Sequence, residues 1–534
     1  MMDRLKLVLK YFAGRFPNLP EFYWENFQEK GPPPGGFSLK ELNDALDHWV
    51  EEGEIYRGQQ REQKTVFMFG MTRQWITQTA LTALGLTGLG YQVTLGYVPY
   101  LHWKKTSNLF DQGRQNQYIK HVLSLMDPPV DVLSLWELQG RSILPKELES
   151  MLRASTIRDV KYCLMREDVD PDSKIYKLRY ERNHRIAEIV YPLLKENSPD
   201  VVIVPNGSVL EFGIVFQIAK HLGIPAVSYE FGEQKRRIWL AKNQDVMRQR
   251  TDGLWNVARD IYLSGKELDQ IRDLYQARRG AHQWQQFSRQ WQKVTSSGGK
   301  KIRKKLGLDS RPIVLLPTNV LGDSLTLGRE IISESMTEWI VQTIRYFQED
   351  PSYQLIVRIH PGEQLSWGPS VYEILEDYFD DLPDHIHIIH PTAEVNSYDL
   401  IELCSLGIVF TTTLGLEMVL SGKPVIVVGE THYREKGFTL DPNSWEDYLL
   451  ILEQVLAEPE KYQPSEEDIN LAWRYAYHFF FNYPFPFPWH VQHFGEDLEE
   501  WPLRKVLSRE GRQRFEQTFR YLAGEPVNWE KEIQ

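Results

Sequence analysis

Along most of this chain, segments with two different patterns of hydrophobic and polar positions follow one another. Short runs that are apolar at successive positions, typical of strands buried on both faces, precede longer stretches with apolar residues three or four positions apart, typical of helices. From Lys64 on, KTVFMFG predicts a strand, ITQTALTALGLTGLG a helix that ends at a glycine, and YQVTLGYVPY a second strand. The pattern therefore predicts a β-α-β opening.

The same alternation returns after a helical, charged middle. PDVVIVPNG predicts a strand and a turn, VLEFGIVFQIAKHLG a helix, and IPAVSYEFG the next strand. A second alternating unit follows, with strands RPIVLLPTN, YQLIVRIHP, HIHIIHP, LGIVFTT and KPVIVVG and helices at 328–348, 371–380, 396–404 and 415–421. We therefore expect an α/β fold with two Rossmann-like lobes and parallel sheets.

Breakers and polar stretches predict how these lobes are separated. GPPPGG at 31–36 interrupts short helical patterns, helical spacing resumes near Ser38, and SSGGKKIRKKLGLDSR closes a polar connector with a flexible joint. The aromatic run HFFFNYPFPFPWH at 478–490 indicates packing of the last helices more than membrane contact. We expect a helical leader at 1–60, an N-terminal lobe at 61–275, a linker at 276–305, a C-terminal lobe at 306–455, and a helical segment at 456–534 that packs across both lobes.

Composition narrows the possible partners. With 534 residues, 42% of them hydrophobic, the chain is too long for one core and average for a packed globular protein. A formal charge of −12 argues against nucleic acid as a partner. Two cysteines form neither a disulfide framework nor a zinc site, and the amphipathic start MMDRLKLVLKYFAGRF lacks the features of a secretory signal. We expect a cytoplasmic protein.

The strongest local signal lies in LGIVFTTTLGLEMVLSGKPVIVV. An apolar strand ends in Thr411, Thr412 and Thr413, Gly415 opens a helix, and Glu417 lies in the first helical turn. Parallel sheets bind ligands at the carboxyl ends of their strands, where helix N-termini offer N–H groups to phosphate and a carboxylate can accept hydrogen bonds from ribose. A donor nucleotide is one interpretation, and a threonine cap with a glutamate that complements the helix dipole is the other.

Two other strand ends of this lobe carry polar residues. Arg358 and His360 alternate onto one face at the end of YQLIVRIHP, where they can hold phosphate while Pro361 fixes the turn. The alternative is a strand terminus with a solvated arginine and a capped histidine. In PTNVLGDS, Asn319 and Asp323 suit a loop near a phosphate or sugar, or an ordinary polar turn.

The first lobe also gathers polar groups at strand ends. An acceptor hydroxyl would need a general base, and we expect Glu230, which closes the strand IPAVSYE, with Glu233 and Glu211 as rivals. The basic run at 235–237 is a candidate contact for an anionic group or a solvated loop. Acceptor-side residues follow the strand VVIVP: Asn206, Gly207 and Ser208.

Together these motifs resemble the capsule polysaccharide biosynthesis proteins, a GT-B-like family related to the capsule Kdo transferases. The resemblance covers roughly residues 200–445 and rests on PNG at 205–207, SYEFG at 228–232, PTNVLGD at 317–323, RIHP at 358–361 and TTLGLEMVLSGKPVIVVGETHYREKGFT at 412–439. The chain departs from the family at Lys436, where a bulky residue is common, and in lacking Arg-Pro after its Glu-x-Gly. The resemblance implies sugar transfer from a nucleotide donor, often CMP-linked, with His360 on the donor phosphate and Glu417 near the nucleotide.

The sequence thus predicts a metal-independent glycosyltransferase of surface polysaccharide synthesis. The C-terminal lobe would bind the nucleotide-sugar, a co-substrate, and the N-terminal lobe would bind a glycan or glycolipid acceptor and supply the base. No cofactor is expected, and the inner face of the membrane is a candidate contact surface. The alternatives are a polyol-phosphate transferase with a CDP-linked donor, a non-catalytic nucleotide-sugar-binding scaffold, and a sugar-nucleotide epimerase.

Overall fold

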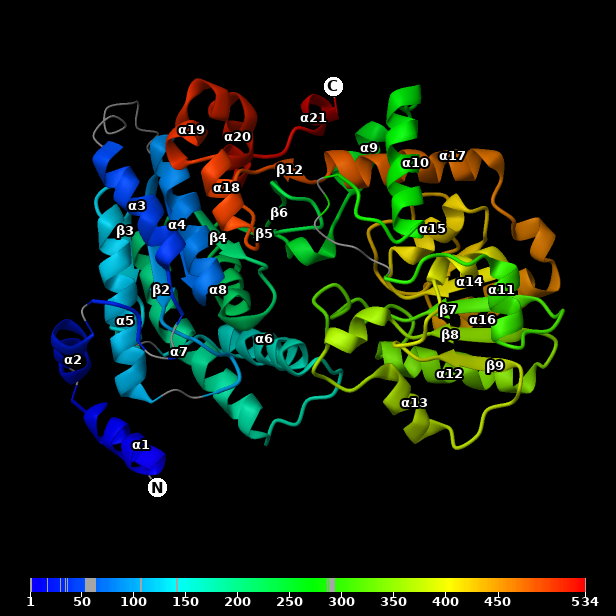
Figure 1. Cartoon of the computed structure of the whole chain (residues 1–534), viewed down its shortest axis with the longest axis horizontal. Coiled ribbons are helices and arrows are strands. Elements are labelled where there is room, and N and C mark those ends of the chain that lie inside the picture. The colour runs from blue at the N-terminus through cyan, green and yellow to red at the C-terminus, as the bar shows by residue number, and fades with distance from the viewer. Residues whose placement is uncertain are drawn as a thin grey trace. The chain divides into compact units, whose positions relative to one another are not determined.

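The chain forms two compact units, each built on its own sheet (Figure 1). The computed structural model describes residues 2–16, 18–28, 30–33, 35, 37–52, 64–105, 108–140, 143–285, 287 and 293–533. Unit 1 comprises residues 1–163, 170–246 and 485–527, and unit 2 comprises residues 164–169, 247–484 and 528–534. The predicted α/β class with two Rossmann-like lobes is confirmed.

Unit 1 contains a seven-stranded sheet with the order β12-β6-β5-β4-β1-β2-β3. The five strands from β5 to β3 are parallel, whereas β6 runs antiparallel to both of its neighbours. The order reverses between β1 and β4, which is where open parallel sheets bind ligands. The strands are β1 (Thr65–Met71), β2 (Gln92–Val98), β3 (Asp131–Ser134), β4 (Val201–Pro205), β5 (Ala226–Glu230), β6 (Arg237–Lys242) and β12 (Phe485–Pro486).

Helices cover both faces of this sheet. Leucine and isoleucine side chains of α6 and α7 join those of α8 and the strands in one core cluster. On the α4 side, a β-carbon added at Gly85 would lie 2.7 Å from the Phe519 ring, so glycine permits the close approach of α20. The helices are α1 (Met2–Ala13), α2 (Leu19–Phe27), α3 (Lys40–Glu52), α4 (Arg73–Gly88), α5 (Leu109–Leu123), α6 (Lys146–Leu164), α7 (Lys174–Asn197), α8 (Leu210–His221), α18 (Phe494–Glu500), α19 (Leu503–Leu507) and α20 (Arg509–Leu522).

Unit 2 contains a five-stranded, fully parallel sheet with the order β11-β10-β7-β8-β9, which reverses between β7 and β10. Its core packs strand residues against Trp339 of α12 and Tyr448 of α16. The strands are β7 (Ile313–Pro317), β8 (Gln354–Arg358), β9 (Ile386–Ile389), β10 (Leu406–Val409) and β11 (Val425–Val427). The helices are α9 (Asp252–Ala258), α10 (Gly265–Arg279), α11 (Gly299–Lys305), α12 (Met336–Glu349), α13 (Val371–Tyr378), α14 (Ser397–Leu403), α15 (Leu414–Leu420), α16 (Trp445–Ala457), α17 (Glu466–Tyr477) and α21 (Trp529–Ile533).

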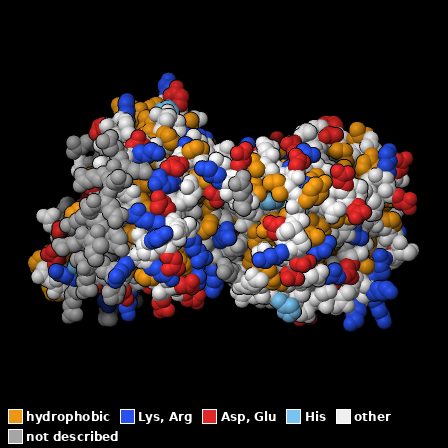
Figure 2. Space-filling view, turned by 90° about the horizontal axis from the view of Figure 1, so that it is seen from above, with side chains coloured by type: hydrophobic (Ala, Val, Ile, Leu, Met, Phe, Trp, Pro, Cys, Tyr) orange, Lys and Arg blue, Asp and Glu red, His pale blue; other side chains and the backbone are white. Residues whose placement is uncertain are grey.

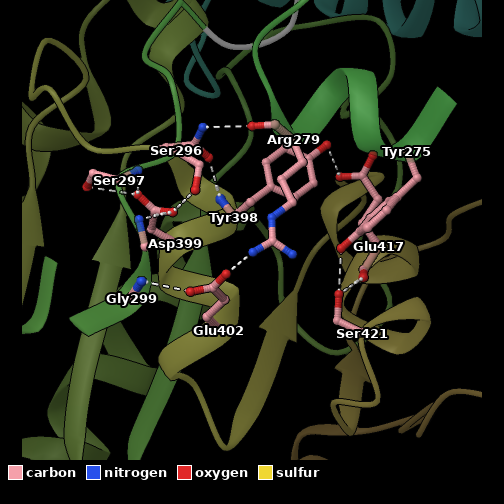
Figure 3. A network of polar contacts seen from close by, with 12 residues as sticks. Tyr275, Arg279, Ser296, Ser297, Gly299, Tyr398, Asp399, Glu402, Glu417 and Ser421 are labelled. Carbon is pink, nitrogen blue, oxygen red and sulfur yellow. Dashed lines mark hydrogen bonds and ion pairs between the residues drawn. The ribbon is translucent and has the colours of Figure 1, made fainter. Parts of the chain in front are cut away.

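The boundaries between the units differ from those that the polar stretches suggest. Residues 276–305 were expected to be a linker, yet they belong to unit 2. Asp399 of α14 accepts hydrogen bonds from Ser296 Oγ at 2.5 Å and from the backbone N–H groups of Ser297 and Gly298 at 2.9 and 3.1 Å (Figure 3). These bonds attach residues 296–298 to α14. Residues 286 and 288–292 of the expected linker lie outside the described residues.

The C-terminal segment is divided between the units. Residues 456–484 belong to unit 2 and residues 485–527 to unit 1. Most of the aromatic run at 478–490 is buried, including Phe479, Phe487 and Trp489, as expected for packing. None of the described helices is long and apolar enough to cross a membrane. Basic and acidic side chains are interspersed over the described part of the face in Figure 2.

An ion triad is fully buried in unit 1. The Arg179 guanidinium donates from Nε to Asp159 and from Nη2 to Glu211, both at 2.7 Å. Burial raises the pKa of Asp159, and its charged partner Arg179 opposes that shift. Asp159 also accepts the Leu210 backbone N–H at 3.1 Å, so the triad fixes the first residue of α8.

We expect Arg179→Met to lower the free energy of unfolding by about 3–5 kcal/mol, because it leaves two carboxylates buried without their cation. Urea denaturation followed by circular dichroism measures the change. Arg158→Met is the matched control, since its pair with Asp245 spans 3.8 Å and is partly exposed. A loss equal to that of the control would contradict a stabilising triad.

Candidate functional site

The carboxyl ends of β7, β8 and β10 surround a cavity in unit 2. This rim includes the point at which the strand order reverses, between β7 and β10. Six of the predicted donor-side residues line the cavity: Arg358, His360, Pro361, Thr412, Thr413 and Glu417. Its other lining residues are Arg278, Pro317, Thr318, Ser397, Tyr398 and Leu414.

Arg358 brings a buried positive charge to this cavity. Only 3% of the residue is exposed, and its Nη groups donate to the carbonyls of His390 at 2.7 Å and Val395 at 3.3 Å. Its Nε is buried and has no hydrogen-bond partner among the described residues, and no described carboxylate pairs with it. Burial lowers the pKa of Arg358 to about 10, so the side chain is protonated at neutral pH. An uncompensated cation in a cavity is suited to an anion.

His360 is held in one orientation at the same rim. Its Nδ1 accepts the Gly362 N–H at 2.9 Å, and its backbone N–H donates to Thr318 Oγ1 at 3.0 Å. Because Nδ1 accepts, the hydrogen-bond pattern assigns the ring hydrogen to Nε2. His360 is therefore arranged to donate a hydrogen bond from Nε2 and not to act as a base there.

The Thr411–Glu417 turn is shaped by contacts within unit 2. Thr413 is the N-cap of α15 but makes no side-chain cap bond, whereas Thr412 Oγ1 accepts the N–H of Leu414, the first residue of the helix, at 3.3 Å. The Thr412 carbonyl accepts the Tyr433 hydroxyl at 2.6 Å. A β-carbon at Gly415 would lie 2.3 Å from that hydroxyl, so the glycine makes room for Tyr433 and is absent from the cavity wall.

Glu417 is buried in a polar network beside the cavity (Figure 3). Its carboxylate lies 2.7 Å from Arg278 Nε and accepts the Tyr398 hydroxyl at 2.9 Å. Burial raises the pKa of Glu417, and the Arg278 charge and the Tyr398 bond oppose this. The Glu417 carboxylate, which was predicted to accept hydrogen bonds from ribose, thus already has two protein partners. Any bond from ribose would use the remaining lone pairs of the carboxylate.

Asn319, Asp323 and Thr411 lie outside the cavity wall. Asn319 Oδ1 accepts the Thr411 N–H at 3.2 Å, which joins the ends of β7 and β10. Asp323 accepts the Leu325 N–H at 2.8 Å and shapes its own loop. These residues therefore stabilise the loops that follow β7 and β10 and do not line the cavity.

Sequence reasoning missed four polar residues of the cavity. Thr318 directly follows β7 and is the threonine of the PTN motif, although it was not selected. Ser397 and Tyr398 begin α14 and belong to no motif. Arg278 lies near the end of α10, in a stretch taken for a connector. Its spacing to Glu417 in sequence gives no signal that the two pair.

Unit 1 places Asn206 and Glu230 in a second cavity. Asn206 Nδ2 donates to Glu230 Oε2 at 3.1 Å, across the ends of β4 and β5. Asn206 and Gly207 both have positive φ, 57° and 82°, and a β-carbon at Gly207 would lie 2.7 Å from Ser228. The cavity is lined by Gln74, Trp75, Tyr162, Asn206, Val209, Leu210, Phe212, Glu230, Val491 and Gln492.

The other acceptor-side predictions do not line that cavity. Ser208 is buried and donates to Asn206 Oδ1 at 2.6 Å, which holds the turn. Glu233 lies in the loop after β5, outside the cavity wall. Glu211 is fully buried against Arg179, so it is unsuited to act as a base. In the basic run, Lys235 and Arg236 contact carboxylates of α18: Glu496, Asp497 and Glu500.

Glu363 connects the His360 turn to α13. It lies in η4 (Pro361–Leu365) and accepts Ser370 Oγ at 2.5 Å and the Val371 N–H at 3.2 Å. Burial raises the pKa of Glu363 to about 7. The carboxyl therefore titrates near neutral pH inside the segment that follows His360.

Among the described residues, no group of three or more His, Cys, Asp or Glu side chains could hold a metal ion.

Two Rossmann-like units with cavities at their strand ends define a GT-B-like α/β fold. Residues 271–459 match the family described as capsule polysaccharide biosynthesis protein. The match confirms the resemblance seen in the motifs and includes every residue that lines the unit 2 cavity. The PNG and SYEFG motifs of unit 1 lie outside it. No curated protein matches the sequence.

Solved structures with a similar course of the chain include two of KpsC from Thermosulfurimonas dismutans. KpsC β-Kdo 2,4 transferase is 16% identical, with 52% of this chain and 79% of that chain covered and a TM-score of 0.34. KpsC β-Kdo 2,7 transferase is 14% identical, with 57% and 87% covered and a TM-score of 0.31. UDP-GlcNAc 2-epimerase of Neisseria meningitidis is 14% identical, with 77% and 95% covered and a TM-score of 0.25.

The raised pKa of Glu363 predicts a pH-dependent stability. Between its ordinary pKa of 4.5 and about 7, the folded protein binds this proton more tightly than the unfolded chain. The wild type should therefore lose stability as pH rises through that window. Glu363→Gln removes the titration, so the melting temperature of the variant should rise relative to that of the wild type as pH increases from 5 to 7.5. A constant difference across this range would contradict the assignment.

Proposed function

We propose that this protein is a glycosyltransferase and that unit 2 holds the nucleotide of an activated sugar donor. The observation that carries the proposal is the Arg358 guanidinium, which is buried, protonated and without a carboxylate partner at the wall of the cavity. A buried charge of this kind is costly unless a ligand neutralises it. The family match of the same segment supports a role in capsule polysaccharide synthesis.

The charge of the cavity favours a donor with one phosphate. Among its described lining residues, Arg278 faces the carboxylate of Glu417, which leaves Arg358 as the cation available to a ligand. One uncompensated positive charge matches the single negative charge of a CMP-linked sugar better than the two charges of a nucleoside-diphosphate sugar. A CMP-linked sugar is therefore the first donor to test.

The leaving phosphate would be stabilised by fixed groups. As the bond between the anomeric carbon and the phosphate oxygen breaks, negative charge grows on that oxygen, and the Arg358 cation and the His360 Nε2–H would offset it. Because Gly362 fixes Nδ1, the histidine needs no reorientation during the reaction. These residues would bind and stabilise CMP as it departs.

Glu230 of unit 1 is our candidate for the base. It lines the unit 1 cavity, and Asn206 holds one carboxylate oxygen. Glu230 would take the proton from an acceptor hydroxyl while the hydroxyl oxygen bonds to the anomeric carbon. The acceptor would be a glycan or glycolipid, reached at the inner face of the membrane.

Arg358→Met should weaken CMP binding by about 10- to 100-fold, because a charged hydrogen bond contributes about 1.5–3 kcal/mol. Calorimetric titration with CMP, CDP and UDP measures this and also tests the preference for one phosphate. Arg311→Met, which removes a partly exposed arginine paired with Asp309 away from the cavity wall, is the control and should bind as the wild type does. Unchanged CMP affinity in Arg358→Met would overturn the donor site.

Glu230→Gln should lower the rate of sugar transfer by about 100-fold or more while leaving CMP affinity unchanged, since the amide cannot accept the proton. Glu233→Gln is the matched control and should retain turnover. Mass spectrometry of the products distinguishes a transferred sugar from a transferred polyol phosphate, and incubation with donor alone reveals an epimerase. Full activity of Glu230→Gln would refute its role as base.

A further inference from the structure

The first two helices expose an apolar surface. Ten large hydrophobic side chains of α1, α2 and the turn between them are each between 37% and 65% exposed. Monomeric proteins seldom leave so many neighbouring apolar side chains in water. We name this set the N-terminal patch: Leu7, Val8, Leu9, Tyr11, Phe12, Phe16, Leu19, Phe22, Tyr23 and Phe27.

Helix α1 is attached to the protein by its polar side. Lys10 Nζ pairs with Asp111 of α5 at 2.8 Å, and a β-carbon at Gly14 would lie 2.7 Å from the Phe110 backbone nitrogen. Val8 and Phe12, four residues apart, lie on the opposite face, and Leu7 and Tyr11 lie between that face and Lys10. An amphipathic helix of a globular protein normally turns its apolar stripe toward the core, so this orientation is inverted.

Helix α2 is fixed beside it by two buried residues. Pro20 lies against Gly113 of α5, and the Trp24 ring lies 5.5 Å from the His121 ring. Phe22 and Phe27 remain more than half exposed although this anchoring holds their helix in place. The patch is therefore a fixed surface of unit 1, beside α5 in Figure 1.

The charged side chains around α1 indicate which kind of partner the N-terminal patch contacts. Residues 2–16 hold four basic and one acidic side chain in a chain whose formal charge is −12. Lys6 and Arg15 are exposed at the border of the patch, while the exposed carboxylates of α2 are Glu21 and Glu25. Aliphatic and aromatic side chains bordered by basic ones are typical of helices that lie in the interface of an anionic membrane.

We infer that the N-terminal patch docks this protein on anionic lipid bilayers. The apolar side chains would enter the boundary between headgroups and acyl chains, and Lys6 and Arg15 would contact anionic headgroups. The choice of a bilayer over a protein partner rests in part on the proposed function, since a glycolipid acceptor is presented there. A second copy of the chain on the same face is the competing occupant.

Vesicle flotation of the full chain tests this inference. Binding is expected with phosphatidylcholine vesicles that contain phosphatidylglycerol, and weaker binding with phosphatidylcholine alone. Val8→Glu with Phe12→Glu should reduce binding at least about tenfold, because two apolar anchors become charged. Lys6→Glu with Arg15→Glu should reduce binding only to the anionic vesicles, by about fivefold for each positive charge lost.

Leu450→Glu is the matched control, because Leu450 is an exposed leucine on α16 of unit 2 and should leave flotation unchanged. Melting temperature and CMP affinity in solution show that each variant is folded. The inference would be overturned if the Val8→Glu, Phe12→Glu variant floated with vesicles as well as the wild type does. It would also be overturned if the two substitutions dissociated a dimer and left flotation unchanged. CMP titration needs no vesicles, so failure of the donor site and failure of membrane docking are separate results.

Discussion

The ion pair between Arg278 and Glu417 organises the unit 2 site. It joins the end of α10 to the first turn of α15, and the Tyr398 hydroxyl adds α14 to the same carboxylate. All three residues line the cavity, so one buried carboxylate fixes its wall from three helices. Removing either charge would leave the other buried alone, which is why this pair constrains every group around it. It also neutralises the cavity's second arginine and leaves the charge of Arg358 for a ligand.

Unit 1 contains a buried glutamate–arginine pair at the equivalent place. In each sheet the fourth parallel strand in chain order leads into a helix that carries a buried glutamate: Glu211 in α8 and Glu417 in α15. Each is paired with an arginine from another helix, Arg179 or Arg278. In unit 1 the triad lies behind the turn and supports it, whereas in unit 2 the glutamate reaches the cavity. A shared architecture thus places a structural carboxylate in one unit and a cavity-lining one in the other.

The sequence predicted the motifs of the site better than their roles. Strand ends are recognisable because a buried apolar run stops at polar residues, so Arg358, His360, Thr412 and Glu417 were found. Gly415 was assigned to the donor site because it opens the helix after a strand end, yet it makes room for Tyr433. Glu230 was preferred over Glu211 because it closes a strand, and packing agrees, since it buries Glu211 and leaves Glu230 at a cavity. The strands β3 and β6 were missed because they lie outside the central apolar strands and are only partly buried.

The sequence by itself determined the two alternating units, the parallel strands and the polar residues at their ends, because hydrophobic periodicity and turn residues are local properties. Tertiary structure alone decided that residues 276–305 belong to unit 2, that Arg278 meets Glu417, and that α1 turns its apolar face outward. Each of these depends on contacts between segments far apart in the chain. The charge that has no carboxylate partner after those contacts form, on Arg358, is the basis of the anion site that we propose.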